Sequence, residues 1–231
     1  MSRFTEVSAE RESTELSPSP AESNILPDHL SEEEARDFWD NRFADAFQEE
    51  NQESCEDDIW GEIFGRDEAD FIFDFEIDND IRSLLDRFEP AQWDDLLDEE
   101  KVDVIRQFVA VLADRLDLDL VPDVAFFAGP QTLLGEYSHT DNCVELNTML
   151  LDHPDLLRNV IPHEMRHAYQ HQRAGLQETR QDDLYRINFD NYISPVPLPD
   201  GKYLFFTDYQ DQLVEAEARA FASLFSHKEA F

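Results

Sequence analysis

Residues 161–172 read IPHEMRHAYQHQ, and this stretch decides how the rest of the chain is interpreted. His163 and His167 are four positions apart, and Glu164 directly follows the first of them. Positions four apart lie one turn apart on the same face of an α-helix, so both imidazoles can bind one ion through a ring nitrogen. Glu164 would lie beside them and could act as a base on water activated by the metal. The alternative is a solvated helix face that carries imidazoles by accident.

The third histidine of the stretch, His171, is a poorer ligand for the same ion. On a helix it would lie about 12 Å from His163 along the axis and about 80° around it. A single small ion cannot bridge that distance, because its bonds to imidazole are about 2.1 Å long. We therefore expect His171 to be solvated or to support the ligands from behind.

Local signals predict a long helix around the motif. Residues 153–175 include Pro154, which suits a first helical turn, and Gly175, which suits the end of a helix. Pro162 predicts either a kink in one helix, which we favour, or the start of a second helix just before the histidines.

The remaining sequence predicts further helices and a small sheet. Apolar periodicity and turn residues indicate where these strands and helices lie. The predicted strands are residues 121–127 and a hairpin over 136–147. The predicted helices lie between residues 81 and 120 and over 207–231, and the last of them is capped near Asp208. Residues 176–206 are predicted to be rich in loops.

The final helix supplies the candidates for a third metal ligand. Glu215 shares a helix face with Ala218 and Ala222, whose small side chains would let this helix pack closely against the histidine helix. Glu217 lies on a different side, in line with Phe221. We therefore predict Glu215 as the third ligand and Glu217 as a residue that supports the ligands or as the alternative ligand.

Other positions for the third ligand are less favourable. The metzincin extension needs Gly at position 170 and His at position 173, where this chain has Gln170 and Arg173, so that class is excluded. Glu178 and the pair Asp182 and Asp183 follow soon after the motif, and they remain alternatives as ligands from a loop.

Charge divides the chain into two parts. The 231 residues carry 54 Asp and Glu against 18 Lys and Arg, a net charge of -36, and residues 1–100 hold 33 of these acids with only 7 of the bases. The excess argues against binding to nucleic acid backbones or anionic membranes, because both repel it. It suits a basic protein partner for the acidic N-terminal region.

The N-terminal region divides further by composition. Residues 1–30 are rich in Ser, Glu and Pro and predict a disordered tail. Residues 31–80 predict an acidic, partly helical interaction segment, with a helix over 31–50. Within it, FIFDFEIDND (71–80) predicts either one strand or an acidic, hydrophobic segment of the kind that binds partners.

Cysteine usage and hydropathy indicate a cytoplasmic protein. Cys55 and Cys143 are far apart and form no C-x-x-C motif, which favours a reducing compartment over a disulfide scaffold. No signal peptide and no apolar run of membrane-spanning length is present in the sequence. Export by a route that needs no signal is left open.

Two segments together resemble a known family. HEMRHAYQ (163–170), followed by DYQDQLVEAEARAFA (208–222), resembles the small gluzincin-type zinc metallopeptidases, of which the ImmA/IrrE-type proteases are similar examples. GEYSHTDNCVELNTMLL (135–151) resembles the strand pair that this family places before its active helix. The resemblance covers residues 100–231. It implies an α+β, minimal zincin-like domain over 81–231, with a small antiparallel or mixed sheet packed on the HExxH helix and on a C-terminal glutamate helix.

The same resemblance implies a zinc-dependent endopeptidase that acts on a protein or peptide. Its implied zinc ligands are His163, His167 and Glu215, and its implied catalytic base is Glu164. A donor to the developing oxyanion usually assists such chemistry, and the candidates are Tyr209, Tyr169 and His171. The alternative function is an acidic protein-interaction or nucleic-acid-mimic module that carries a catalytically inactive zincin fold.

Overall fold

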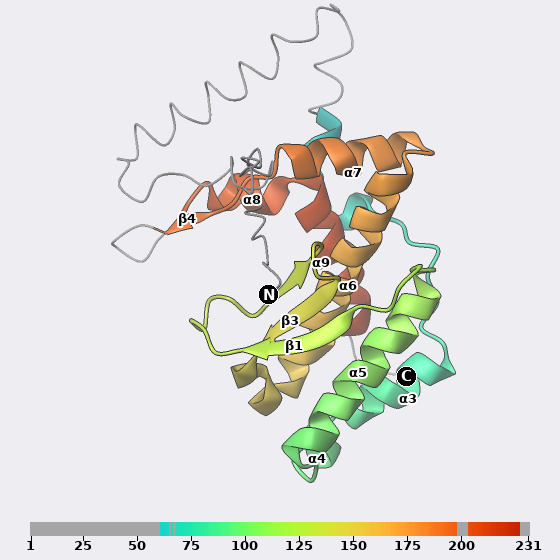
Figure 1. Cartoon of the computed structure of the whole chain (residues 1–231), viewed down its shortest axis with the longest axis vertical. Coiled ribbons are helices and arrows are strands. Elements are labelled where there is room, and N and C mark those ends of the chain that lie inside the picture. Colours follow the sequence, from blue (N-terminus) through green and yellow to red (C-terminus); the bar gives the residue numbers. More distant parts are fainter. Residues whose placement is uncertain (1–60, 65, 67, 198–202, 227–231) are drawn as a thin grey trace, which may run out of the picture. The chain divides into compact units, whose positions relative to one another are not determined.

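A computed structural model describes residues 61–64, 66, 68–197 and 203–226, which belong to the compact unit Gln52–Phe231 (Figure 1). The predicted tail at 1–30 and the predicted helix at 31–50 lie outside the described residues. The helices are α3 (Asn79–Arg87), α4 (Pro90–Trp93), α5 (Asp98–Arg115), α6 (Pro154–Leu176), α7 (Arg180–Asp190), α8 (Phe206–Asp211) and α9 (Leu213–Ser226), with 3₁₀ turns η2 (Glu68–Asp70) and η3 (Thr148–Asp152). The strands are β1 (Asp123–Phe127), β2 (Gly135–Ser138), β3 (Cys143–Asn147), β4 (Val196–Pro197) and β5 (Tyr203–Leu204).

The main sheet is small and mixed. Its strand order is β1-β3-β2, with β1 parallel and β2 antiparallel to β3. The predicted strand at 121–127 and the predicted hairpin at 136–147 are therefore confirmed. Val144 and Leu146 of β3 are fully buried and point to the helical core, as the two-residue period of a strand requires. The predicted α+β class is confirmed.

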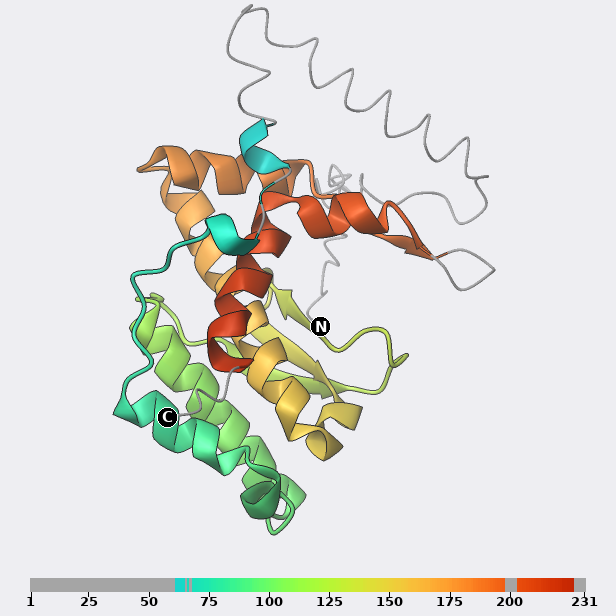
Figure 2. The ribbon, with the colours of Figure 1, turned by 180° about the vertical axis from the view of Figure 1, so that it is seen from behind.

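Helix α6 is the central element of the unit. It lies between the sheet on one side and α9 on the other (Figures 1 and 2). It runs through Pro162 as one element, so the alternative of a second helix starting there is wrong. It also continues past Gly175, and Gln177 takes the left-handed conformation that ends it. The histidine motif lies on α6, so the contacts of α6 with the sheet and with α9 together fix its position.

Gly135 allows β2 to lie close against α6. A Cβ at this position would lie 2.7 Å from Cγ1 of Val160 and 3.3 Å from the Glu145 carbonyl oxygen. We expect Gly135→Ala to lower the free energy of unfolding by about 1–3 kcal/mol, as overpacking does, measured by urea denaturation. Gly175→Ala is the matched control, because a Cβ there meets nothing within 4 Å. Equal losses in both variants would show that the contact with Val160 does not matter.

Residues 71–77 form an extended segment rather than a strand. Their side chains are alternately half-buried and exposed, as in a strand, but within the described part of the chain no sheet partner pairs with them. Phe73 and Phe75 instead meet the ring of Phe221 on α9 edge-on, with centroids 5.4 and 4.9 Å apart. The strand alternative for 71–80 is wrong. These contacts join the segment to the helical core.

Two other predictions about the C-terminal half are wrong. The predicted loops at 176–206 contain α7, which begins with a reciprocal cap between Thr179 and Asp182. The single helix predicted over 207–231 is broken into α8 and α9 at Gln212, whose backbone is extended. The side chain of Gln212 donates to the carbonyl of Ile193 and accepts from the amide of Asn188, so tertiary hydrogen bonds hold the break.

No described helix combines the length with the apolar composition that crossing a membrane requires.

Candidate metal site

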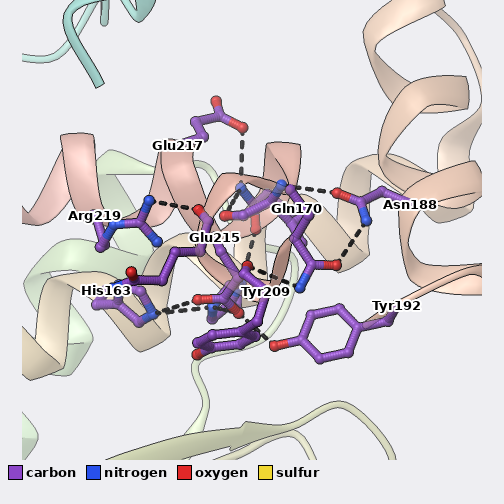
Figure 3. A network of polar contacts seen from close by, with 12 residues as sticks. His163, Gln170, Asn188, Tyr192, Tyr209, Glu215, Glu217 and Arg219 are labelled. Atoms are coloured by element: carbon purple, nitrogen blue, oxygen red, sulfur yellow. Dashed lines mark hydrogen bonds and ion pairs between the residues drawn. The ribbon is translucent and has the colours of Figure 1, made fainter. Parts of the chain in front are cut away.

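Helices α6 and α9 bring the three predicted ligands to one point. The Nε2 atoms of His163 and His167 are 3.2 Å apart. Glu215, in the first turn of α9, places its Oε2 atom 3.4 Å from Nε2 of His163 and its Oε1 atom 3.3 Å from Nε2 of His167 (Figure 3). One nitrogen or oxygen from each residue lies within 4.8 Å of the others, so this group could hold a metal ion.

The spacing of these atoms fits a small tetrahedral ion. Two ligands bonded to zinc at about 2.0–2.1 Å in tetrahedral geometry lie about 3.3 Å from each other. The 3.2 Å between the two imidazole nitrogens agrees with that value, and each nitrogen has a different oxygen of Glu215 at 3.3 or 3.4 Å, while one atom from each of the three residues lies within 4.8 Å of the others. Two imidazoles with one carboxylate suit zinc and similar transition metals, whereas calcium and magnesium prefer shells of oxygen atoms. The donor set therefore fits zinc.

The charges of these side chains favour the binding of a cation. Burial alone would raise the pKa of Glu215, but the two imidazoles hold that pKa well below its usual range. Burial alone would lower the pKa of His167, but Glu215 outweighs it and raises the pKa to about 9. Glu215 is 2% exposed and also accepts a hydrogen bond from the Tyr192 hydroxyl. A metal ion would replace the proton that His167 otherwise carries beside this carboxylate.

Gln170 contacts the far side of the His167 ring. Its side-chain oxygen lies 2.9 Å from Nδ1 of His167, and its amide nitrogen donates to the carbonyl of Val214 and to Oε2 of Glu217, each at 3.0 Å. The amide orientation follows from these two acceptors, since only the nitrogen can donate to them. Nδ1 of His167 therefore carries a proton, and when a metal ion replaces the proton on Nε2, the lone pair of Nε2 is available to that ion.

Glu217 lies behind the ligands and not among them. Its carboxylate accepts hydrogen bonds from the Arg166 guanidinium, from the Tyr185 hydroxyl and from Gln170. The side chains of Arg166 and Glu217 are both about nine-tenths buried. All three donors are directed at Glu217, so Glu217 lies behind the ligands. Glu215 instead lies where the ligand atoms of His163, His167 and Glu215 converge, which we call the metal point.

Glu164 is a buried carboxylate beside the two histidines. It is 6% exposed and interacts with the charges of both imidazoles. Burial raises its pKa, while the neighbouring His163 and His167 oppose that rise. Glu136 on the edge strand β2 adds a smaller repulsion that also raises the pKa. A buried carboxylate beside two imidazoles can interact with water or with a bound molecule.

Tyr209 is the oxyanion-donor candidate that lies beside the group. Burial and the charge of Glu215 both raise the pKa of Tyr209, so its hydroxyl keeps its proton. Its ring packs edge-on against Tyr192, with centroids 6.2 Å apart. Figure 3 shows both tyrosines near Glu215.

The other two donor candidates contact different neighbours. Tyr169 stacks under the Arg166 guanidinium at 4.2 Å. His171 is stacked between His139 and Phe189, with centroids 4.4 and 3.7 Å away. Burial lowers the pKa of His171 to about 3. His171 is therefore a half-buried ring stacked between two aromatic neighbours.

Comparison of the chain with family models, curated proteins and solved structures found no match. The functional argument consequently depends on the residues of this chain and on their geometry.

Apart from Glu217, sequence reasoning missed the residues that support the ligands. Gln170 lies three positions after His167 on the same helix face, and that spacing could have revealed it. Tyr185 and Tyr192 lie in the region predicted as loops, so no signal pointed to them. The pairing of Arg166 with Glu217 joins two helices 51 positions apart and is visible only in the structure.

Proposed function

We propose that this chain is a zinc-dependent peptidase of the gluzincin type. His163, His167 and Glu215 bind the zinc ion, and Glu164 is the general base. The observation that supports the proposal is the pair of imidazole nitrogens, 3.2 Å apart, with the two oxygens of Glu215 at 3.3 and 3.4 Å from them, beside the buried carboxylate of Glu164. When bound, zinc is a Lewis acid that activates water and polarises a carbonyl group.

The remaining steps, proton transfer and stabilisation of the oxyanion, are carried out by Glu164 and Tyr209. Glu164 accepts the proton of the attacking water and passes it to the leaving amine, as a buried carboxylate beside the metal ligands can do. Tyr209 donates its hydroxyl hydrogen to the substrate carbonyl oxygen as negative charge develops there. The hydroxyl retains its proton because burial raises its pKa, so it can serve as a hydrogen-bond donor.

Strand β2 suits the binding of an extended polypeptide. It is an edge strand that pairs only with β3 within the described sheet, and Gly135 places it directly against α6. An extended peptide can add to such an edge through main-chain hydrogen bonds. The substrate that we propose is therefore a protein or peptide in extended conformation.

Metal analysis of matched variants tests the site. We expect about one zinc ion per wild-type chain, and loss of that ion in His163→Ala because a ligand is removed. His153→Ala is the control, since His153 is exposed at the start of the same helix and its side chain makes no capping hydrogen bond. Elemental analysis after dialysis gives the metal content, and digestion of a peptide library gives the activity. Equal zinc content in both variants would rule out this ligand set.

The charge of residues 1–80 favours a second role for that part of the chain. Its excess of acids makes a basic protein partner the proposed binding partner. Salt-dependent binding of basic polypeptides to the whole chain is the measurement that checks this role.

A further inference from the structure

We infer that Gln170 is a positioning residue that fixes the tautomer of His167, and that the buried pair of Arg166 and Glu217 in turn fixes Gln170. The inference rests on the proposed metal site and goes beyond it, because none of these three residues binds the metal. Figure 3 shows Gln170 and Glu217 on the side of the network away from the metal point.

The first step concerns the orientation of the Gln170 amide. Its nitrogen lies 3.0 Å from two acceptors, the Val214 carbonyl and Oε2 of Glu217, and its side chain is fully buried. If the amide were flipped, its oxygen would face two oxygen atoms without a hydrogen between them. Such unsatisfied buried groups are costly, so one orientation is fixed.

The second step concerns the proton of His167. With the amide so fixed, the Gln170 oxygen at 2.9 Å can only accept, and Nδ1 of His167 must donate. In the neutral ring Nε2 then keeps its lone pair, which is the form that binds a metal. The opposite neutral tautomer would place its proton on Nε2, where it blocks the metal-binding position, and would leave the Gln170 oxygen without a donor. A hydrogen bond to the second ring nitrogen usually fixes a ligating histidine in this way.

The third step concerns what holds Glu217. Its Oε1 atom accepts from Arg166 and from Tyr185, which leaves Oε2 for Gln170. Arg166 is enclosed by aromatic rings, with Phe73 at 5.0 Å, Tyr169 at 4.2 Å and Phe221 at 5.3 Å from its guanidinium carbon. Water is largely excluded here, so each of these hydrogen bonds is stronger than on a surface. The chain of contacts thus runs from the 71–77 segment to a metal ligand.

The test compares Gln170→Leu with Gln172→Leu. Gln172 lies on the same helix and also makes two hydrogen bonds, to the amide of Asp119 and the carbonyl of Asp117, but it makes none to the histidines. Zinc affinity is measured by competition with a chelator at fixed pH, and folding of each metal-free variant is checked by thermal unfolding. We expect zinc affinity to fall about 10–100-fold in Gln170→Leu and to stay within about threefold of wild type in Gln172→Leu. An unchanged affinity in Gln170→Leu would overturn the inference.

A second measurement needs no variant. In the zinc-loaded wild-type chain, nitrogen NMR of the His167 ring should show a slowly exchanging proton on Nδ1 and the metal on Nε2. Metal on Nδ1, or a ring proton that exchanges freely, would overturn the inference even if Gln170→Leu failed to fold. If the chain binds zinc with this tautomer but cuts no peptide, the peptidase proposal fails and the inference stands. If wild-type chain binds no zinc, both fail together.

Discussion

Glu164→Gln is expected to slow peptide hydrolysis by about 10²–10⁴-fold, the usual contribution of a general base, while zinc content stays unchanged. Glutamine has nearly the shape of glutamate, so the buried site keeps its packing, but an amide cannot accept the proton of the attacking water. Zinc is retained because Glu164 is not one of the three residues whose atoms converge on the metal point. Cleavage rates on a peptide library and elemental analysis of the same sample are the two measurements.

The control for this variant is Asp155→Asn, which makes the same change of charge at an exposed position on the same helix. We expect its cleavage rate to equal that of wild type. If Glu164→Gln cuts peptides at the wild-type rate, another group is the base. If it loses zinc as well as activity, Glu164 belongs to the ligand set, and the proposed division of roles is wrong.

The parts of the fold that sequence predicted are those determined by local patterns. The strand β1 and the hairpin of β2 and β3 follow from alternation and turn residues, and α6 follows from helical spacing. Helix α7 was missed although Thr179 and Asp182 form a capping pair that can be recognised in the sequence. The break at Gln212 had no local signal, because hydrogen bonds to residues of another segment hold it.

The candidate site shows the same division between local and tertiary information. The pairing of His163 with His167 depends on helix geometry alone, and the preference for Glu215 over Glu217 depended on small residues on its helix face. The structure places Glu215 at the metal point, 3.3 and 3.4 Å from the imidazole nitrogens. Neither the partner of Glu217 nor the enclosure of Arg166 could be predicted, because both arise where separate helices meet.

Glu217→Ala is expected to lower the free energy of unfolding by about 3–5 kcal/mol, the usual cost of leaving a buried charge without its partner. The variant leaves Arg166 charged and enclosed, and its Nε atom already has no hydrogen-bond partner among the described residues. Urea denaturation in the presence of a chelator is the measurement, since bound zinc would add its own stabilisation. Glu68→Ala, which breaks an exposed contact with Arg219, is the control and should cost about 0–1 kcal/mol.

The double variant Arg166→Met with Glu217→Leu separates folding from positioning. Apolar residues of similar size often replace a buried ion pair without loss of stability, so we expect the double variant to regain most of what Glu217→Ala loses. Gln170 would still lack its Glu217 acceptor, and zinc affinity should therefore stay below that of wild type although the fold is restored. A double variant that remains as unstable as Glu217→Ala would mean that the unpaired Arg166 charge is not the cause. A stable double variant with wild-type zinc affinity would mean that the ion pair serves the fold and not the metal ligand.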